Sequence, residues 1–290
     1  MTRGSLDRAV LVTGASSGIG RAAVSKAVRE GAHVFASVRK AGDAESLKAE
    51  FGEAVTPLLF DVTDEAAVRA GAEQVAAALG RRKLFGLVNN AGVAVPGPLL
   101  YMDSDELRQQ FEINVLGVHN VTRAFAPLLG AESDRTGKPG RIVMISSVAG
   151  QDGNPFVGPY VMSKHALEGY SKSLRRELLL FGIDVIIVGP GAIATPIWDK
   201  AEKADVARFQ NTPYGAFTER VASYMVENGR KGLPASDVGD LIWFCLSDAK
   251  PKTRYPILRR PFMDRMLPRW LGERAVDRIV AKRLGFKTLP

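Results

Sequence analysis

The chain has 290 residues, of which 46% are hydrophobic and 24% are charged, and its formal net charge is +8. Such a length and composition are typical of a globular protein with one or two domains. The sequence contains no apolar run of about 18 residues, so it predicts no membrane span. Residues 1–250 carry 28 basic and 28 acidic side chains, whereas residues 251–290 carry 11 and 3. The charge therefore belongs to a basic tail, which excludes a general nucleic-acid-binding surface.

The single cysteine, Cys245, cannot form a disulfide within the chain and indicates a reducing compartment. Residues 1–7 lack the apolar run of a secretory signal. We therefore expect a cytoplasmic protein.

The chain opens with a strand, a glycine-rich turn and a helix. Residues 9–12 are an apolar run, residues 21–30 have a helical pattern, and Gly14, Gly18 and Gly20 lie between them. Glycines allow a sharp turn and the close approach of a pyrophosphate, and a helix N-terminus offers free N–H groups to it. The spacing differs from G-x-G-x-x-G, so a tight turn without a ligand remains the alternative to a dinucleotide site.

Strands and helices then alternate along the chain. The alternation predicts an α/β fold with a doubly wound, Rossmann-type, mostly parallel sheet of seven strands and helices on both faces. Pro57 favours an edge position for the third strand. The predicted strands are residues 9–12, 34–38, 55–60, 84–89, 141–146, 183–188 and, at an edge, 254–258. The predicted helices between them are residues 21–30, 44–51, 64–79, 104–129 and 157–181.

The pattern changes after residue 191. Residues 195–232 mix polar and aromatic side chains and are expected to form helical segments over a ligand crevice. A capped apolar helix is expected at residues 236–246, and a helix pair interrupted at Pro268 within residues 261–284. We expect one dinucleotide-binding and catalytic domain, residues 1–260, and a basic helical extension, residues 261–290.

Polar or glycine-rich clusters follow the predicted strands. Because ligands of a doubly wound sheet lie beyond the carboxyl ends of its strands, these clusters predict one binding site along that edge. The clusters are Arg39-Lys40, Asp61-Val62, Asn89-Asn90-Ala91-Gly92, Ser146-Ser147 and Pro190-Gly191 through Thr195.

Tyr160 and Lys164 lie four residues apart in a predicted helix, so their side chains share one face. A nearby cation favours phenolate, which lowers the pKa of a tyrosine from about 10 and makes it usable in proton transfer. The three histidines, His33, His119 and His165, are scattered without metal-ligand spacing, so we expect no metal site.

Taken together, these motifs resemble those of the short-chain dehydrogenase/reductase family over roughly residues 7–258. The matching pieces are Thr13-Gly14-x-x-x-Gly18-x-Gly20, Asn89-Asn90-Ala91-Gly92, Asn114, Ser147, Tyr160-x-x-x-Lys164, and Pro190-Gly191 with Thr195. The resemblance implies an oxidoreductase that transfers a hydride between a nicotinamide cofactor and an alcohol, ketone or aldehyde.

The resemblance also implies the roles of four catalytic residues. Tyr160 would be the proton donor to a carbonyl, and Lys164 would hold the nicotinamide ribose and lower the pKa of Tyr160. Ser147 would hydrogen-bond the substrate oxygen. Asn114 would hold a water in a proton relay with Lys164.

The same resemblance implies the contacts with the cofactor. Thr195 would bind the nicotinamide carboxamide, Asn90 would border the cofactor, and Asp61 and Val62 would approach the adenine. The full expected set is Gly14, Ser16, Ser17, Gly18, Ile19, Gly20, Arg39, Asp61, Val62, Asn90, Ala91, Gly92, Tyr160, Lys164, Pro190, Gly191, Ile193 and Thr195.

The second strand ends in Arg39 and Lys40, and the next acidic residue is Asp43. An acid at this point would bind a ribose 2′-hydroxyl, whereas the arginine fork suits a 2′-phosphate. We therefore expect NADP, with NAD left open.

The expected substrate contacts are mostly apolar, which favours a small hydrophobic alcohol or ketone. The overall pattern is similar to family members that act on steroids and retinoids and to some hydroxybutyrate dehydrogenases. The alternatives are an NAD-dependent dehydrogenase of a small hydroxy acid and a non-catalytic nucleotide sensor or scaffold. The expected lining residues are Val93, Val95, Gln151, Phe156, Val157, Ala192 and Trp198.

Two further expectations concern association. The resemblance implies a homodimer or homotetramer that pairs the helices of residues 104–129 and 157–181. Residues 261–285 form a basic amphipathic segment, which we expect to pack on the protein, with contact to an anionic membrane as the alternative.

Overall fold

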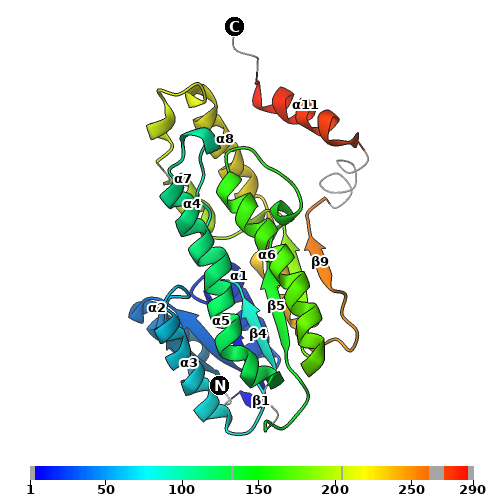
Figure 1. Cartoon of the computed structure of the whole chain (residues 1–290). Coiled ribbons are helices and arrows are strands. Elements are labelled where there is room, and N and C mark those ends of the chain that lie inside the picture. The colour runs from blue at the N-terminus through cyan, green and yellow to red at the C-terminus, as the bar shows by residue number, and fades with distance from the viewer. Residues whose placement is uncertain (1–3, 132–133, 204, 261–270, 287–290) are drawn as a thin grey trace.

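The computed structural model describes residues 4–131, 134–203, 205–260 and 271–286. Its centre is a seven-stranded sheet in the order β3-β2-β1-β4-β5-β6-β9, and every neighbouring pair is parallel (Figure 1). The strands are β1 (Ser5–Val12), β2 (Ala32–Val38), β3 (Val55–Leu59), β4 (Gly86–Asn89), β5 (Arg141–Ile145), β6 (Asp184–Pro190) and β9 (Arg254–Ile257). The predicted doubly wound α/β fold is confirmed, and so are the edge positions of β3 and β9.

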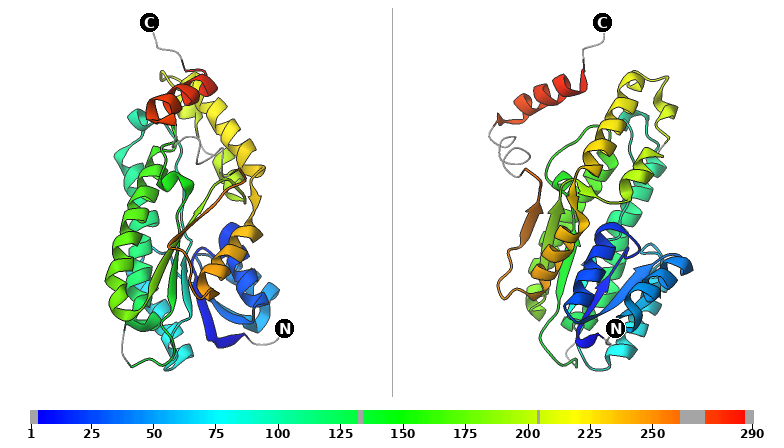
Figure 2. Two further views of the ribbon diagram at one scale, coloured as in Figure 1. Left: turned by 90° about the vertical axis from the view of Figure 1, so that its right-hand side faces the viewer. Right: turned by 180° about the vertical axis from the view of Figure 1, so that it is seen from behind.

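Helices cover both faces of the sheet, as Figure 2 shows with the sheet seen edge-on. The helices are α1 (Gly18–Arg29), α2 (Ala41–Phe51), α3 (Glu65–Leu79), α4 (Ser104–Phe111), α5 (Gly117–Ala126), α6 (Gly158–Glu177), α7 (Ile197–Glu202), α8 (Gly215–Arg230), α9 (Ala235–Ser247) and α11 (Glu273–Leu284). A short parallel pair, β7 (Ile193–Ala194) with β8 (Leu233–Pro234), stands apart from the main sheet and was not expected from the sequence.

The core lies in two layers because successive strand side chains point to opposite faces. Along β1, Val10 and Val12 join one cluster with residues of α1, α2 and α9, while Ala9 and Leu11 join the other with residues of α3, α5 and α6. All four side chains are at most 1% exposed. Burial on both faces explains why the strands read as continuous apolar runs.

Two predicted helices differ in detail. The helix expected at residues 104–129 contains a π-helical turn, Glu112–Leu116, between α4 and α5. Asp103 and Glu106 form the capping box at its start. The cap expected for α9 is absent, because Pro234 occupies the N-cap position and offers no side-chain acceptor. The break expected at Pro268 lies outside the described residues.

Three helices after β6, α7, α8 and α11, gather beyond the carboxyl ends of the strands. α7 and α8 stand at this end of the molecule, and α11 contacts α8 there (Figures 1 and 2). The expected helical segments over this edge are therefore present. Within the described residues, we find no helix with the length and apolar character needed to cross a membrane.

Candidate active site

The glycine-rich turn joins the end of β1 to the start of α1. Gly14 and Gly18 have φ values of 64° and 56°, in the left-handed region that favours glycine. Ser17 is the N-cap of α1 but makes no side-chain capping hydrogen bond. The first N–H groups of α1 are therefore left without a side-chain cap, and such groups bind anions. This arrangement fits the pyrophosphate of a dinucleotide.

Asn90 and Thr13 attach this turn to the end of β4. The Asn90 Nδ2 donates to the carbonyls of Thr13 at 2.9 Å and Gly14 at 3.1 Å. Thr13 Oγ1 accepts from the backbone N–H groups of Asn90 and Ala91 at 3.0 and 3.1 Å. These four hydrogen bonds hold the phosphate-binding turn against the residues that follow β4.

Thr195, from the segment after β6, packs against the turn. A Cβ on Gly18 would lie 3.2 Å from the Cβ and Cγ2 of Thr195, so the glycine permits this close approach. Pro190 and Gly191 precede Thr195 at the end of β6. The Gly191 N–H donates to Ile257 O of β9 at 2.9 Å and so anchors the start of this segment. Ile193 is buried beside them. The expected residues after β6 and those of the first turn thus lie together.

Arg39 and Asp61 meet at the ends of β2 and β3, with 3.5 Å between Arg39 Nη1 and Asp61 Oδ2. Burial raises the pKa of Asp61, but hydrogen bonds from Thr63 and the charge of Arg39 hold it below its ordinary value. The Arg39 side chain is 61% exposed. Arg39 therefore lies at the surface of the cofactor edge, where it can exchange Asp61 for another anion.

The other expected cofactor residues serve to hold this edge together. Val62 is buried, and it packs so closely on α5 that a Cβ on Gly117 would lie 2.6 Å from its Cγ2. A Cβ on Gly20 would lie 2.2 Å from Gly14 O, and one on Gly92 would lie 3.1 Å from Asn114 Oδ1. Close backbone packing therefore requires Gly20, whereas at Gly92 the neighbour is the Asn114 side chain, which would have to shift by a few tenths of an ångström.

Ser147 and Tyr160 meet where β5 and α6 come together. The Ser147 hydroxyl donates to Pro190 O at 3.3 Å and accepts from the Ala149 N–H at 3.1 Å. The Ser147 side chain also interacts with the Tyr160 hydroxyl, which lowers the pKa of Tyr160. A hydroxyl pair at the carboxyl edge of the sheet can hold a carbonyl oxygen between them.

The pKa of Tyr160 is raised above its usual value because burial disfavours the phenolate, and the hydrogen bond with Ser147 offsets this only in part. The expectation that Lys164 lowers this pKa is wrong for the protein alone. Lys164 Nζ lies 5.7 Å from the centroid of the Tyr160 ring and donates to Ile145 O at 2.8 Å. Tyr160 is therefore a neutral phenol at neutral pH.

Burial lowers the pKa of Lys164 to about 8, against the charge of Glu168, which raises it. Glu168 lies one helical turn further along α6 and pairs with Arg254 of β9, whose Nε donates to both carboxylate oxygens at 3.0 and 3.1 Å. Arg254 Nη2 also donates to Ser147 O at 3.3 Å. A buried ion pair thus lies directly behind the Ser147 and Lys164 positions.

Sequence reasoning missed this pair. The only local signal is that Glu168 follows Lys164 by four residues on the same helix, whereas Arg254 comes from a strand 86 residues further along.

Asn114 connects three segments beside Lys164. Its Oδ1 accepts from the Val93 N–H at 2.9 Å, and its Nδ2 donates to Val93 O and Ser163 Oγ, both at 3.0 Å. Gln110, which sequence reasoning missed, adds hydrogen bonds to Val95 N at 2.9 Å and Val93 O at 2.6 Å. The Asn114 side chain is thus engaged with protein groups, and it fixes the loop after β4.

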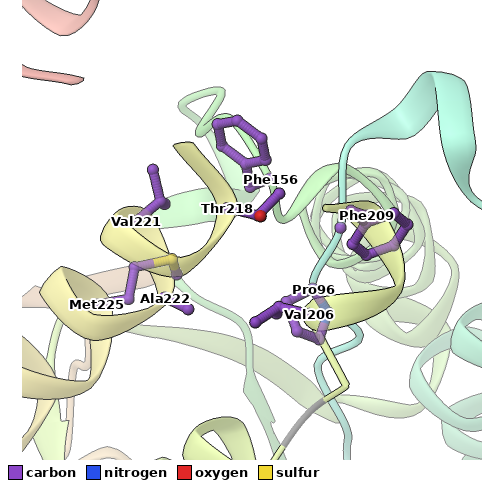
Figure 3. A pocket seen from close by; sticks show the side chains of 9 residues that line it. Pro96, Phe156, Val206, Phe209, Thr218, Val221, Ala222 and Met225 are labelled. Carbon is purple, nitrogen blue, oxygen red and sulfur yellow. The ribbon is translucent and has the colours of Figure 1, made fainter. Parts of the chain in front are cut away.

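A small apolar pocket lies beyond this loop, between it and α8 (Figure 3). Of the expected substrate residues, only Phe156 is among those that line it. The lining residues are Pro96, Gly97, Phe156, Val206, Phe209, Thr218, Val221, Ala222 and Met225. Those of α8 were missed, and their signal is the apolar spacing within residues 218–225.

The remaining expected substrate residues do not line this pocket. Val157 is buried and pairs with Gly97, and Trp198 Nε1 donates to Ile193 O at 2.7 Å. The Trp198 indole covers Gly229, and a Cβ added to this glycine would lie 2.0 Å from the indole. Gln151 is half-buried, and Ala192 is exposed at the start of the segment after β6.

Comparison with known proteins gives consistent findings. A family model described as short chain dehydrogenase matches residues 8–206. An NADPH-dependent 3-dehydrocapnine reductase from Ornithobacterium rhinotracheale is 38% identical over 277 residues, which cover 96% of this chain and 97% of that protein. Retinol dehydrogenase 16 from Mus musculus is 31% identical over 263 residues, covering 86% and 80%.

Solved structures agree with these relatives. A short chain dehydrogenase/reductase from Burkholderia phymatum in complex with NAD is 26% identical, with a TM-score of 0.74 over 99% of this chain and 98% of that one. A short-chain dehydrogenase from Streptomyces avermitilis is 29% identical, with a TM-score of 0.72 over 96% and 92%.

Proposed function

The chain belongs to the short-chain dehydrogenase/reductase family and is an oxidoreductase, and we propose that it reduces a hydrophobic ketone or aldehyde with NADPH, using Tyr160 as the general acid. The observation that carries the proposal is the meeting of Ser147, Tyr160 and Lys164 at the carboxyl edge of the sheet, beside an uncapped helix N-terminus. The nicotinamide would supply the hydride when it is bound.

The chain's own residues would handle the proton. The carbonyl oxygen would accept hydrogen bonds from the hydroxyls of Ser147 and Tyr160, and Tyr160 would transfer its proton as the alkoxide forms. The raised pKa of Tyr160 keeps the phenol protonated at neutral pH, which supports the reductive direction. Lys164, held by Ile145 O, would bind the ribose hydroxyls and stabilise the phenolate that the transfer leaves.

The apolar side chains around Phe156 support a hydrophobic substrate. The relatives include a 3-dehydrocapnine reductase and a retinol dehydrogenase, and retinol is a hydrophobic alcohol. A panel of ketones, aldehydes and secondary alcohols, tested with NADPH and NADH by the absorbance of the reduced ring, checks the proposal. Lack of turnover with every member, despite cofactor binding, would favour a non-catalytic nucleotide-binding protein.

The activity should depend on the charge of Lys164. Because its pKa is about 8, Lys164 is protonated below this pH and loses its charge as the pH rises through it. We expect the rate of ketone reduction to be flat from pH 6 to 7 and to fall about tenfold per unit well above pH 8. A pH profile of kcat/KM measures this, and a rate that stays flat to pH 10 would contradict it.

Arg39 should decide the choice of cofactor. Arg39→Asp replaces a phosphate partner with a repelling charge, so we expect the Kd for NADPH to rise about 10- to 100-fold while that for NADH rises less than about threefold. Arg69→Asp makes the same charge change at a side chain that is 62% exposed and pairs with Glu65, and it serves as the control. Cofactor titration by fluorescence measures both, and equal losses for the two cofactors would show that Arg39 does not bind the 2′-phosphate.

NAD remains the second candidate cofactor. The Burkholderia phymatum neighbour was solved with NAD. In this structure Arg39 forms an ion pair with Asp61. The same titration therefore distinguishes the two candidates.

A further inference from the structure

The C-terminal segment of residues 272–286 ends in an aromatic contact with the substrate end of the site. The Phe286 ring lies 6.0 Å from that of Phe156 and 5.0 Å from that of Phe217, with the ring planes at 64° and 88°. Phe156 precedes α6, and Phe217 belongs to the first turn of α8. Phe286 therefore touches two segments that are far apart in the sequence.

Both segments contribute to the wall of the apolar pocket. Phe156 lines it from the loop before α6, and Thr218 and Val221, which follow Phe217, line it from α8 (Figure 3). Tyr214 adds a ring contact to Phe156 at 5.7 Å. Edge-to-face aromatic contacts of this kind hold rings in a defined orientation. Phe286 thus bridges the walls from outside the pocket.

Phe156 itself needs such support. Its φ is +63°, and no other non-glycine residue in the described parts of the chain has a left-handed φ. This conformation is unfavourable for a side chain with a Cβ and persists only where its surroundings hold it. One restraint is the hydrogen bond from the Gly97 N–H to Phe156 O at 2.8 Å, and the other is the packing of its ring.

The segment is built to present Phe286. Gly285 has a φ of 71° at the end of α11, and the Phe286 N–H donates back to Ala281 O at 2.8 Å. This bond belongs to the Schellman pattern, which turns the chain sharply after a helix. Arg283 lies 4.6 Å above the Tyr224 ring and attaches the same turn to α8.

α11 contributes nothing else to the core. None of its residues from Glu273 to Leu284 is buried, and it contacts α8. An element that buries so little apolar surface adds little to folding. Its aromatic contacts instead converge on the walls of the pocket.

The geometry points to Phe286 as a specificity-determining residue that clamps the two walls and sets the width of the apolar pocket. This inference rests on the proposed function, since the pocket is taken to receive the apolar part of the carbonyl substrate. The clamp selects a slender, linear ketone over a branched or cyclic one. Loss of the ring lets the Phe156 loop and α8 separate, so bulky ketones gain access.

The test compares the full-length wild type with Phe286→Ala on two ketones, linear 2-octanone and the bulkier cyclohexyl methyl ketone. We expect the ratio of kcat/KM, bulky over linear, to rise about tenfold in Phe286→Ala, since small differences in pocket fit typically change such ratios by 10- to 200-fold. Phe286→Leu, which keeps an apolar side chain, should restore part of the ratio. Ile279→Ala, at a side chain of α11 that is 54% exposed, should leave it unchanged.

Hydrogen exchange provides a second measurement that needs no turnover. The amide of Gly97, which donates to Phe156 O, should exchange faster in Phe286→Ala and at the wild-type rate in Ile279→Ala. Unchanged exchange together with an unchanged ratio would overturn the clamp. If the wild type reduces neither ketone, nor any other carbonyl compound, the proposed function fails, and the exchange measurement alone then decides whether Phe286 holds the Phe156 loop.

Discussion

Replacing Tyr160 with phenylalanine is expected to lower kcat by about 10²-fold or more while leaving the Kd for NADPH within about twofold. The ring and its packing are kept, and only the hydroxyl that would donate the proton is lost. Because burial raises the pKa of Tyr160, its hydroxyl is protonated at neutral pH in the wild type. The variant lacks this hydroxyl and its proton. Steady-state kinetics and cofactor titration on the same preparation measure the two effects.

Tyr170→Phe provides a matched control for this variant. Tyr170 lies on the same helix, α6, and its hydroxyl is 3.4 Å from His119 Nδ1, away from Ser147. Turnover of Tyr170→Phe should stay close to that of the wild type. A Tyr160→Phe enzyme with wild-type turnover would exclude Tyr160 as the proton donor and would leave Ser147 as the candidate.

Replacing Glu168 with glutamine is expected to lower the free energy of unfolding by about 3–5 kcal/mol. The Glu168 carboxylate is buried and accepts both hydrogen bonds from Arg254 Nε, so its neutral replacement leaves a guanidinium buried without a counter-charge. Breaking a buried ion pair from one side typically costs this much, because the remaining charge stays desolvated. Urea denaturation followed by circular dichroism measures the change.

Two further variants isolate the cause. Glu168→Gln combined with Arg254→Met removes both charges and should recover much of the lost stability. Glu202→Gln breaks the exposed pair with Arg230 and should have a far smaller effect, because solvent screens exposed charges. A Glu168→Gln protein as stable as Glu202→Gln would show that the buried pair does not stabilise the fold.

The ion pair also bears on the proposed reaction. Arg254 Nη2 donates to the Ser147 carbonyl, and the Glu168 charge supports the protonated form of Lys164. In the proposed reaction, Arg254 and Glu168 would be positioning residues, which act through Ser147 and Lys164. The pKa of Lys164 would fall in Glu168→Gln, because the variant lacks this charge. As the pH rises, the reduction rate of the folded variant should therefore begin to fall at a lower pH than that of the wild type.

The sequence by itself determined the fold and the edge at which the site lies. Both depend on local patterns, because a strand buried on both faces needs a continuous apolar run, and a sharp turn before α1 needs glycine at the left-handed positions Gly14 and Gly18. The spacing of Tyr160 and Lys164 placed both on one face of α6 for the same reason, since helical geometry repeats every 3.6 residues.

Only the tertiary structure decided the sign of the pKa shift of Tyr160, the partners of Asn114 and the walls of the apolar pocket. The pKa of a tyrosine depends on how many neighbouring groups desolvate it and where the nearest cation lies, and Lys164 Nζ is held by Ile145 O on a different element. Arg254 reaches Glu168 and Phe286 reaches Phe156 across long stretches of chain. No local pattern encodes such contacts, because they arise only when the sheet order and the helix packing bring distant segments together.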